Sequence, residues 1–345
     1  MRIILVFFSI LFFVFFDPLN TNYTGIQKSY ILLVFLASAI FVDPRLGSKI
    51  LHFKPRWFFV MYVSYLLISN KIELLKHVTD IRTYLIDKQL LLNYNTSLLQ
   101  TFVAYYQQLV IVSGVVIFLN NERWRYLGLG IILFEVLTTG TRSYGIFIIV
   151  SLLTYYTHKF KWKLKHYFLT AVLLLGMFYV SEVYSHTRSG YELATIELAS
   201  SAISFSKETV MAFKIESGIT EFEDPFLYML SSLIPRALWK EKPMSKIVEW
   251  YTLEFWGFSS DENQGTVLPG LVGQLFLGAR WFGILELFAF LFVCHSLIRF
   301  CQYDLSVQTL FFSGLILSLR MIALANFLPF IISIFLCQWQ LLKRK

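Results

Sequence analysis

The sequence predicts an all-α polytopic membrane protein with about ten transmembrane helices. Of its 345 residues, 57% are hydrophobic and only 15% are charged, and the mean hydropathy is +0.62. A soluble domain carries about 25% charged residues. The hydrophobic residues gather in blocks, and clusters of Lys and Arg recur between alternate blocks. This pattern is typical of membrane-spanning helices and not of one large soluble core.

Ten blocks are expected to be spans, with one long polar loop between the seventh and the eighth. Several blocks are shorter than the ~20 residues that cross the hydrocarbon layer, so we expect flanking aromatic and polar residues to complete them. The first block lacks a small-residue cleavage site and is interpreted as a retained span, not a signal peptide. The expected spans are Ile3–Phe16, Tyr30–Val42, Trp57–Ser69, Leu98–Leu119, Trp124–Thr139, Tyr144–Thr157, Tyr167–Val183, Trp281–Ile298, Leu305–Leu319 and Met321–Leu342.

The short loops fix the expected orientation, because Lys and Arg are enriched in cytoplasmic loops. With both termini in the cytoplasm, the basic clusters at 45–56, 123–125, 159–165 and 343–345 all face inward. An eleventh span at Val267–Leu277 would place the last cluster outside, so we expect a re-entrant or surface helix there. The net charge of +8 therefore follows from topology and predicts no nucleic-acid partner.

The orientation divides the chain into three parts. Residues 1–184 form a bundle of seven spans with a surface helix at about 71–95, where apolar residues recur at helical spacing. Residues 185–280 form an external loop with short or re-entrant helices, and residues 281–345 form the last three spans. A loop of this length is usually functional or a linker, and its many aromatic residues argue against a linker.

Cationic side chains on the external side are the first candidates for a binding site. Guanidinium groups in a partly desolvated setting suit phosphate or pyrophosphate oxygens. The alternative is that they reach lipid headgroups or pair with acids of the loop. The external arginines are Arg82, Arg142, Arg188, Arg236, Arg280 and Arg320, and Lys240 and Lys242 follow Arg236 closely.

Candidate acids and bases are few. Glu135 lies within the fifth expected span and Glu286 within the eighth, and an ionisable group at membrane depth is a functional candidate. His186 could act as a base at the external end of the seventh span, or it is a solvated loop residue. The sequence carries no metal-binding spacing and no Walker-type glycine loop, so we expect no metal, no nucleotide and no cofactor. The three cysteines predict no disulfide framework.

Three local strings, in order along the chain, resemble the O-antigen polymerases of bacterial inner membranes, which join lipid-linked oligosaccharide repeat units. The first is Thr139–Ser143, which reads TGTRS, and the second is Leu233–Pro243, which reads LIPRALWKEKP. The third is Pro269–Gly278, followed by Trp281–Ile284 at the start of the next span. The similarity in topology covers most of the chain, whereas the strings cover only a small part of it.

The resemblance implies a metal-independent glycosyltransferase at the periplasmic face of the inner membrane. Its substrate would be an oligosaccharide on undecaprenyl pyrophosphate, and membrane lipid and a chain-length regulator are further partners that the resemblance allows. Arg142 and Arg236 match the family positions for pyrophosphate contacts, with Arg188, Lys240, Lys242 and Arg280 as additional candidates. The strings do not fix the catalytic base, for which His186 and Glu135 are candidates.

Three other functions remain open at this point: an O-antigen ligase, a flippase, and a non-catalytic membrane scaffold, which the external arginines disfavour only weakly. O-antigen ligases have a similar layout but carry an important histidine in the long external loop, and 187–293 contains no histidine. A flippase for lipid-linked oligosaccharides usually has more spans and short loops, which a folded loop of this length does not fit.

Overall fold

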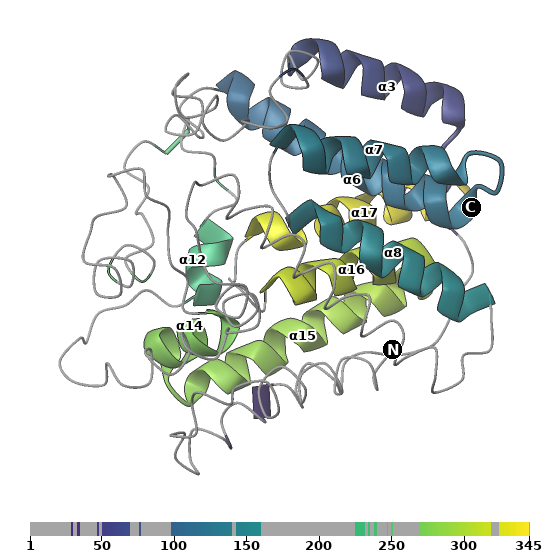
Figure 1. The fold of residues 1–345 in the computed structure, drawn as a ribbon. Coiled ribbons are helices and arrows are strands. Elements are labelled where there is room, and N and C mark those ends of the chain that lie inside the picture. Colours follow the sequence, from purple (N-terminus) through teal and green to yellow (C-terminus); the bar gives the residue numbers. More distant parts are fainter. Residues whose placement is uncertain are drawn as a thin grey trace, which may run out of the picture.

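A computed structural model shows a bundle of apolar helices (Figure 1). It describes residues 50–69, 98–139, 143–159, 225–231, 270–318 and 324–344, together with single positions elsewhere. Every regular element within these ranges is a helix. The helices are α3 (Pro55–Ile68), α6 (Leu98–Asn120), α7 (Arg125–Thr139), α8 (Ser143–Lys159), α12 (Pro225–Ser231), α14 (Gly270–Ala279), α15 (Phe282–Phe300), α16 (Leu305–Ser318) and α17 (Leu324–Arg344).

The expected spans that fall in the described ranges are all helices, namely α3, α6, α7, α8, α15, α16 and α17. Within the described ranges, three segments are long and apolar enough to cross a membrane: Phe102–Asn120, Phe282–Phe300 and Asn326–Arg344. The segments within α3, α8 and α16 are apolar but shorter. Apart from single positions, the expected elements at 3–16, 30–42, 71–95 and 167–183 lie outside the described residues. The all-helical class is confirmed for the described part, and the total of ten spans stays a prediction.

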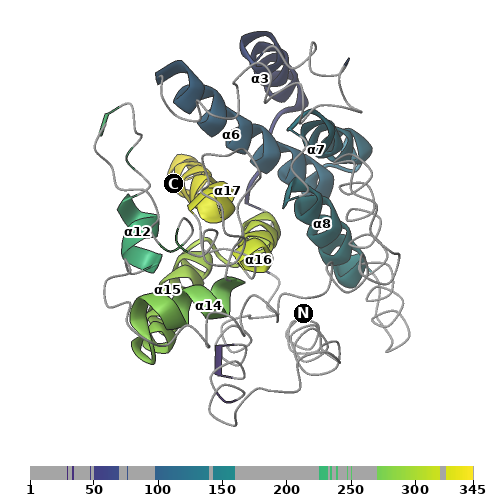
Figure 2. The ribbon, with the colours of Figure 1, turned by 60° about the vertical axis from the view of Figure 1, so that its left-hand side comes forward.

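Helix α16 lies at the centre of the described bundle. It packs against α6, α8, α15 and α17, and Figure 2 shows it between the last three. A helix buried on all sides must also satisfy its polar side chains internally. The hydroxyls of Thr309, Ser313 and Ser318 donate to the carbonyl groups four residues earlier, over 2.8, 2.9 and 2.8 Å. These three hydroxyl groups therefore lie in an apolar environment with their donors paired to the helix backbone.

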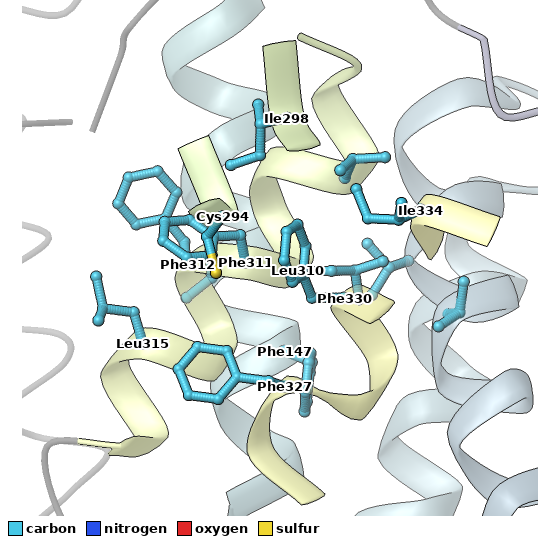
Figure 3. Packing of buried hydrophobic residues seen from close by; sticks show 14 of the residues in the cluster. Phe147, Cys294, Ile298, Leu310, Phe311, Phe312, Leu315, Phe327, Phe330 and Ile334 are labelled. Atoms are coloured by element: carbon cyan, nitrogen blue, oxygen red, sulfur yellow. The ribbon is translucent and has the colours of Figure 1, made fainter. Parts of the chain in front are cut away.

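Aromatic side chains fill the space between α16 and its neighbours. Phe311 of α16 meets Phe330 of α17 with ring centroids 5.3 Å apart, and Phe290 of α15 meets Phe327 edge-on at 4.9 Å. Figure 3 shows Phe311, Phe327 and Phe330 together with Leu310 and other buried residues. These ring contacts join α17 to both α16 and α15.

Helices α6 and α7 approach each other through glycines. A Cβ atom added at Gly128 of α7 would lie 2.5 Å from the carbonyl oxygen of Gly114 in α6. A side chain at Gly128 would therefore collide with the backbone of α6, and its absence allows the close approach seen in the small-residue interfaces of membrane helices. The sequence of α6 and α7 is thus specialised for direct backbone contact at this crossing.

One end of the bundle, which we call the basic end, contains Gly47 and the loops at 50–54, 120–125 and 301–304, together with the last turns of α8 and α17. Gly47 N–H donates to Tyr303 O over 3.0 Å, and a Cβ atom at Gly47 would overlap the carbonyl oxygen of Gln302. Asn120 donates to Leu51 O over 2.7 Å and to Ser306 Oγ over 3.0 Å. The loops that the sequence assigns to the cytoplasm therefore share one end wherever the structure describes them.

Asp304 is the buried centre of the basic end. Its Oδ2 accepts the N–H groups of Ile50 and Leu51 over 2.8 and 3.4 Å, and its Oδ1 accepts those of Ser306 and Val307 over 2.9 and 3.1 Å. The carboxyl group therefore caps the first turn of α16 and holds the 50–51 backbone against it. Burial raises the pKa of the Asp304 carboxyl above its ordinary value, while the four backbone donors oppose that rise.

The other end of the bundle, which we call the opposite end, carries the starts of α6, α8, α15 and α17 and the ends of α3, α7 and α16. Helices α12 and α14 lie at this end in Figure 1. Helix α14 occupies most of the stretch expected as a re-entrant or surface helix. Its 10 residues extend about 15 Å, which is half of a hydrocarbon layer of about 30 Å. Leu271, Val272 and Leu275 are buried, so α14 is packed into the bundle and does not lie loosely on it.

Candidate functional site

Glu135 is the predicted site residue that the structure describes most fully. It lies in the penultimate turn of α7 at the opposite end, and none of its surface is exposed. Its Oε2 accepts a hydrogen bond from the Tyr65 hydroxyl over 2.9 Å and another from Gln107 Nε2 over 2.8 Å. A carboxyl group in a membrane bundle requires such donors, because burial without them would cost several kcal/mol. Glu135 therefore joins α3, α6 and α7.

The aromatic residues of α3 hold Tyr65 in place. Its ring stacks at 6.5 Å from the ring of Tyr62, and it meets Tyr106 of α6 edge-on at 5.6 Å. The Tyr106 hydroxyl donates to Met61 O over 2.6 Å, which ties α6 to the backbone of α3. Tyr65 is itself fully buried, so its hydroxyl is directed to Glu135 by packing on several sides.

A second polar contact lies next to the first. Gln108 Nε2 donates to the hydroxyl of Tyr144, in the first turn of α8, over 3.1 Å. Gln108 Oε1 is buried and has no hydrogen-bond partner among the described residues. Adjacent residues of α6, Gln107 and Gln108, thus face α7 and α8 respectively. The polar cluster, defined as Tyr65, Gln107, Gln108, Glu135 and Tyr144, spans four helices at the opposite end.

The cluster can position a carboxyl group and a phenol, and it is closed in this conformation. Because Glu135 has no exposed surface, a molecule outside the bundle could reach its carboxyl group only after a local rearrangement at this end. Tyr65 and Gln107 both donate to the same oxygen, so either can keep the carboxyl group oriented while the other is displaced.

Arg280 is the second predicted site residue within the described ranges, at the corner between α14 and α15. Its backbone has a φ of 52°, and its N–H donates to Phe276 O over 3.0 Å, which ends α14 with a left-handed cap. The guanidinium lies over the Phe276 ring at 4.9 Å. Stacking engages the face of a guanidinium and not the in-plane N–H groups that bind phosphate. Gly283 allows α15 to approach α14 closely at this corner, since a Cβ atom there would lie 2.7 Å from Leu275 O.

The remaining predicted site residues lie outside the described residues: Arg142, His186, Arg188, Arg236, Lys240 and Lys242. Arg142 falls between the end of α7 at Thr139 and the start of α8 at Ser143. The described Trp239, which is half-exposed, directly precedes Lys240. The contacts of these cations stay predictions. Among the described residues, no group of three or more His, Cys, Asp or Glu is arranged to hold a metal ion.

The sequence reasoning did not anticipate Tyr65, Gln107, Gln108 or Tyr144. The adjacent glutamines were the available signal, since they interrupt the otherwise apolar α6. Tyr65 offered no such signal, because its helix also contains Tyr62 and the sequence does not distinguish the two phenols by spacing. Glu286, the other acidic candidate, lies half-buried in the second turn of α15.

Comparisons with protein-family models, with curated proteins and with solved structures give no match to this chain. The described fold and the polar cluster therefore stand on their own geometry.

Proposed function

We propose that the protein polymerises undecaprenyl-pyrophosphate-linked oligosaccharide repeat units at the periplasmic face of a bacterial inner membrane. The observation that carries the proposal is the position of two of the three family strings. The α7–α8 junction and the α14–α15 corner lie at the same end of the bundle, opposite the basic end. Positively charged loops favour the cytoplasm, and this supports an orientation with these two strings on the outer side. The carboxyl group of Glu135 lies at that end as well.

The proposed reaction transfers a growing glycan to a new repeat unit. A hydroxyl on the terminal sugar of the new lipid-linked unit attacks the anomeric carbon of the glycan. The bond from that carbon to the pyrophosphate oxygen breaks, and undecaprenyl pyrophosphate leaves with the bonding electron pair. The hydroxyl proton passes to a base, for which His186 and Glu135 are the candidates. The donor already stores the required free energy in its pyrophosphate link, so no nucleotide is needed.

Cationic side chains would stabilise the leaving group. Negative charge develops on the pyrophosphate as the glycosidic bond breaks, and prearranged donors act most strongly on charge that appears in the transition state. Arg142 and Arg236 are the proposed main contacts, and Arg188, Lys240, Lys242 and Arg280 are the proposed outer ones. The stacking of Arg280 on Phe276 suits an orienting cation better than a primary ligand.

The proposal includes an orientation, with the basic end and both termini in the cytoplasm and α14 entering the membrane from outside. A reporter enzyme fused after Lys345 tests it. Activity of a cytoplasm-dependent reporter is expected, and an externally active reporter would contradict the orientation.

A gene deletion tests the function. Loss of the polymerase should leave a single repeat unit on the lipid A core, seen as one short band on a gel of surface glycan. Complete absence of glycan from the core would instead indicate the ligase or the flippase. Arg142→Ala or Arg236→Ala should abolish long chains at unchanged protein level, whereas Arg299→Ala at the basic end serves as the matched control. Wild-type chain length in both outer variants would remove the pyrophosphate role of these arginines.

A further inference from the structure

Two segments that are distant in sequence meet at the edge of the basic end, and we call their meeting point the α3–α17 corner (residues 52–57 and 339–344). His52 N–H donates to Gln340 Oε1 over 3.0 Å, and Gln340 Nε2 donates back to His52 O over 3.1 Å. Arg344 Nη2 lies 3.5 Å from Ile50 O. The approach to α3 is therefore tied to the last two turns of α17, and the two segments lie side by side.

The corner is strongly cationic. Lys54, Arg56, Lys343 and Arg344 are all exposed, and the two segments contain no acidic residue. Asp304, the buried acid of the basic end, is occupied by four backbone N–H groups and does not face this surface. The four positive charges thus lack a carboxylate partner within the corner.

The local sequence places an aromatic residue beside each cationic pair. Pro55 at the first position of α3 starts the helix directly after Lys54, which puts Trp57 in the first turn with 73% of its surface exposed. Trp339 of α17 is 61% exposed, and Lys343 Nζ lies 4.9 Å from its ring centre. Indole rings of this kind locate at the headgroup level of a membrane.

An apolar surface continues from the corner along both helices. Phe59 of α3 is 62% exposed and Phe335 of α17 is 72% exposed, each within one or two turns of the neighbouring tryptophan. Cations at the headgroup level above exposed apolar side chains match the two parts of a phospholipid, a phosphate and an acyl chain. We propose that the α3–α17 corner binds an anionic phospholipid through its headgroup phosphate.

General attraction of basic loops to an anionic membrane would act on every cation at the basic end alike. The corner differs because hydrogen bonds fix its two cationic segments side by side, so the cations can converge on one phosphate with little loss of conformational freedom. The proposal rests on placement of the bundle in a membrane and is independent of glycosyl transfer.

Lipid retention by the purified full-length protein tests the proposal. The protein in detergent is incubated with equal amounts of phosphatidylglycerol and phosphatidylcholine of the same acyl chains, and bound lipid is identified by native mass spectrometry. The wild type should retain phosphatidylglycerol preferentially. The triple variant Lys54→Gln/Lys343→Gln/Arg344→Gln should lower that preference by about tenfold or more, since each cation near an anionic surface contributes on the order of fivefold.

The matched control removes three exposed cations from other parts of the basic end, as Arg123→Gln/Lys159→Gln/Arg299→Gln. It should keep the wild-type preference. The double variant Lys54→Gln/Lys343→Gln leaves the Arg344 contact with Ile50 intact and should lose a smaller part of the preference, which separates binding from folding. Equal loss in the corner and control triples, or no preference in the wild type, would overturn the site.

Discussion

The two ends of the helical bundle are held together in different ways. At the basic end, the side chains of Asp304, Asn120 and Gln340 form hydrogen bonds with backbone groups of residues 50–52. Two of these bonds connect this early segment to the last helices of the chain. At the opposite end, the polar cluster joins its helices through side chains alone. Each of these bonds at the basic end holds the main chain of the segment before α3, whereas each bond of the polar cluster holds only a side chain of a helix. We therefore expect the basic end to be the more rigid of the two.

Among the substitutions that test this difference between the two ends, removal of the Asp304 carboxyl group should have the largest effect on stability. Asp304→Ala leaves four buried backbone donors without an acceptor, so we expect a loss in the free energy of unfolding on the order of 3 kcal/mol or more. Thermal unfolding of the purified protein in detergent measures it. Asp304→Asn keeps one acceptor oxygen and should lose about half as much. An alanine variant with the wild-type unfolding midpoint would show that the basic end does not depend on this carboxyl group.

A substitution of Glu135 should distinguish a role of this residue in the proposed reaction from a role in folding at the opposite end. Glu135→Gln retains the side-chain volume and one acceptor oxygen, so we expect a nearly unchanged unfolding midpoint. If Glu135 accepts the proton in the proposed reaction, the same variant should lower the rate of chain extension by about a hundredfold or more. Full activity of a folded Glu135→Gln protein would assign Glu135 to helix packing and leave His186 as the candidate base.

The glycine crossing of α6 and α7 offers a matched pair of substitutions on one helix. Gly128→Ala inserts a methyl group 2.5 Å from Gly114 O, so the helices must separate and the free energy of unfolding should fall by about 1–3 kcal/mol. Gly130→Ala meets no atom within 4 Å and should be neutral or slightly stabilising, because alanine favours a helix. Equal unfolding midpoints for the two variants would contradict the close crossing.

The smallest expected effect is a pH dependence of the basic end. Burial raises the folded pKa of Asp304 above its ordinary value of 3.8, so the folded state binds the proton more tightly than the unfolded state does. This contribution to stability is fully present below pH 3.8 and is lost as the pH rises through the folded pKa. The difference in unfolding midpoint between wild type and Asp304→Ala should therefore shrink as the pH rises across this window. A difference that grows instead would show that the carboxylate is the favoured form.

Hydropathy and loop charge were sufficient to predict most of the described fold. They predicted α3, α6, α7, α8, α15, α16 and α17 nearly to their ends, because a buried or lipid-facing helix must be continuously apolar. The same data indicated a helix near α14 that is too short to span. They did not show that α16 is central, since an apolar helix has the same composition in the core and against lipid.

The candidate site was predictable only in part. Glu135 was recognisable because a carboxyl group within a span is unusual. Its donors were not, because the pairing of Tyr65 with Glu135 depends on the packing of α3 against α6 and α7, which no local spacing encodes. The predicted cations Arg142, Arg188, Arg236, Lys240 and Lys242 and the candidate base His186 lie outside the described residues, and their roles stay predictions from the sequence.

Reconstituted chain extension tests the central claim most directly. The purified protein in liposomes is given undecaprenyl-pyrophosphate-linked repeat units, without nucleotide and with a metal chelator, and the glycans are separated by length. The account predicts a ladder of products longer than one repeat unit, with release of one undecaprenyl pyrophosphate for each added bond. Repeat units that remain single while the protein is folded in the liposomes would contradict it.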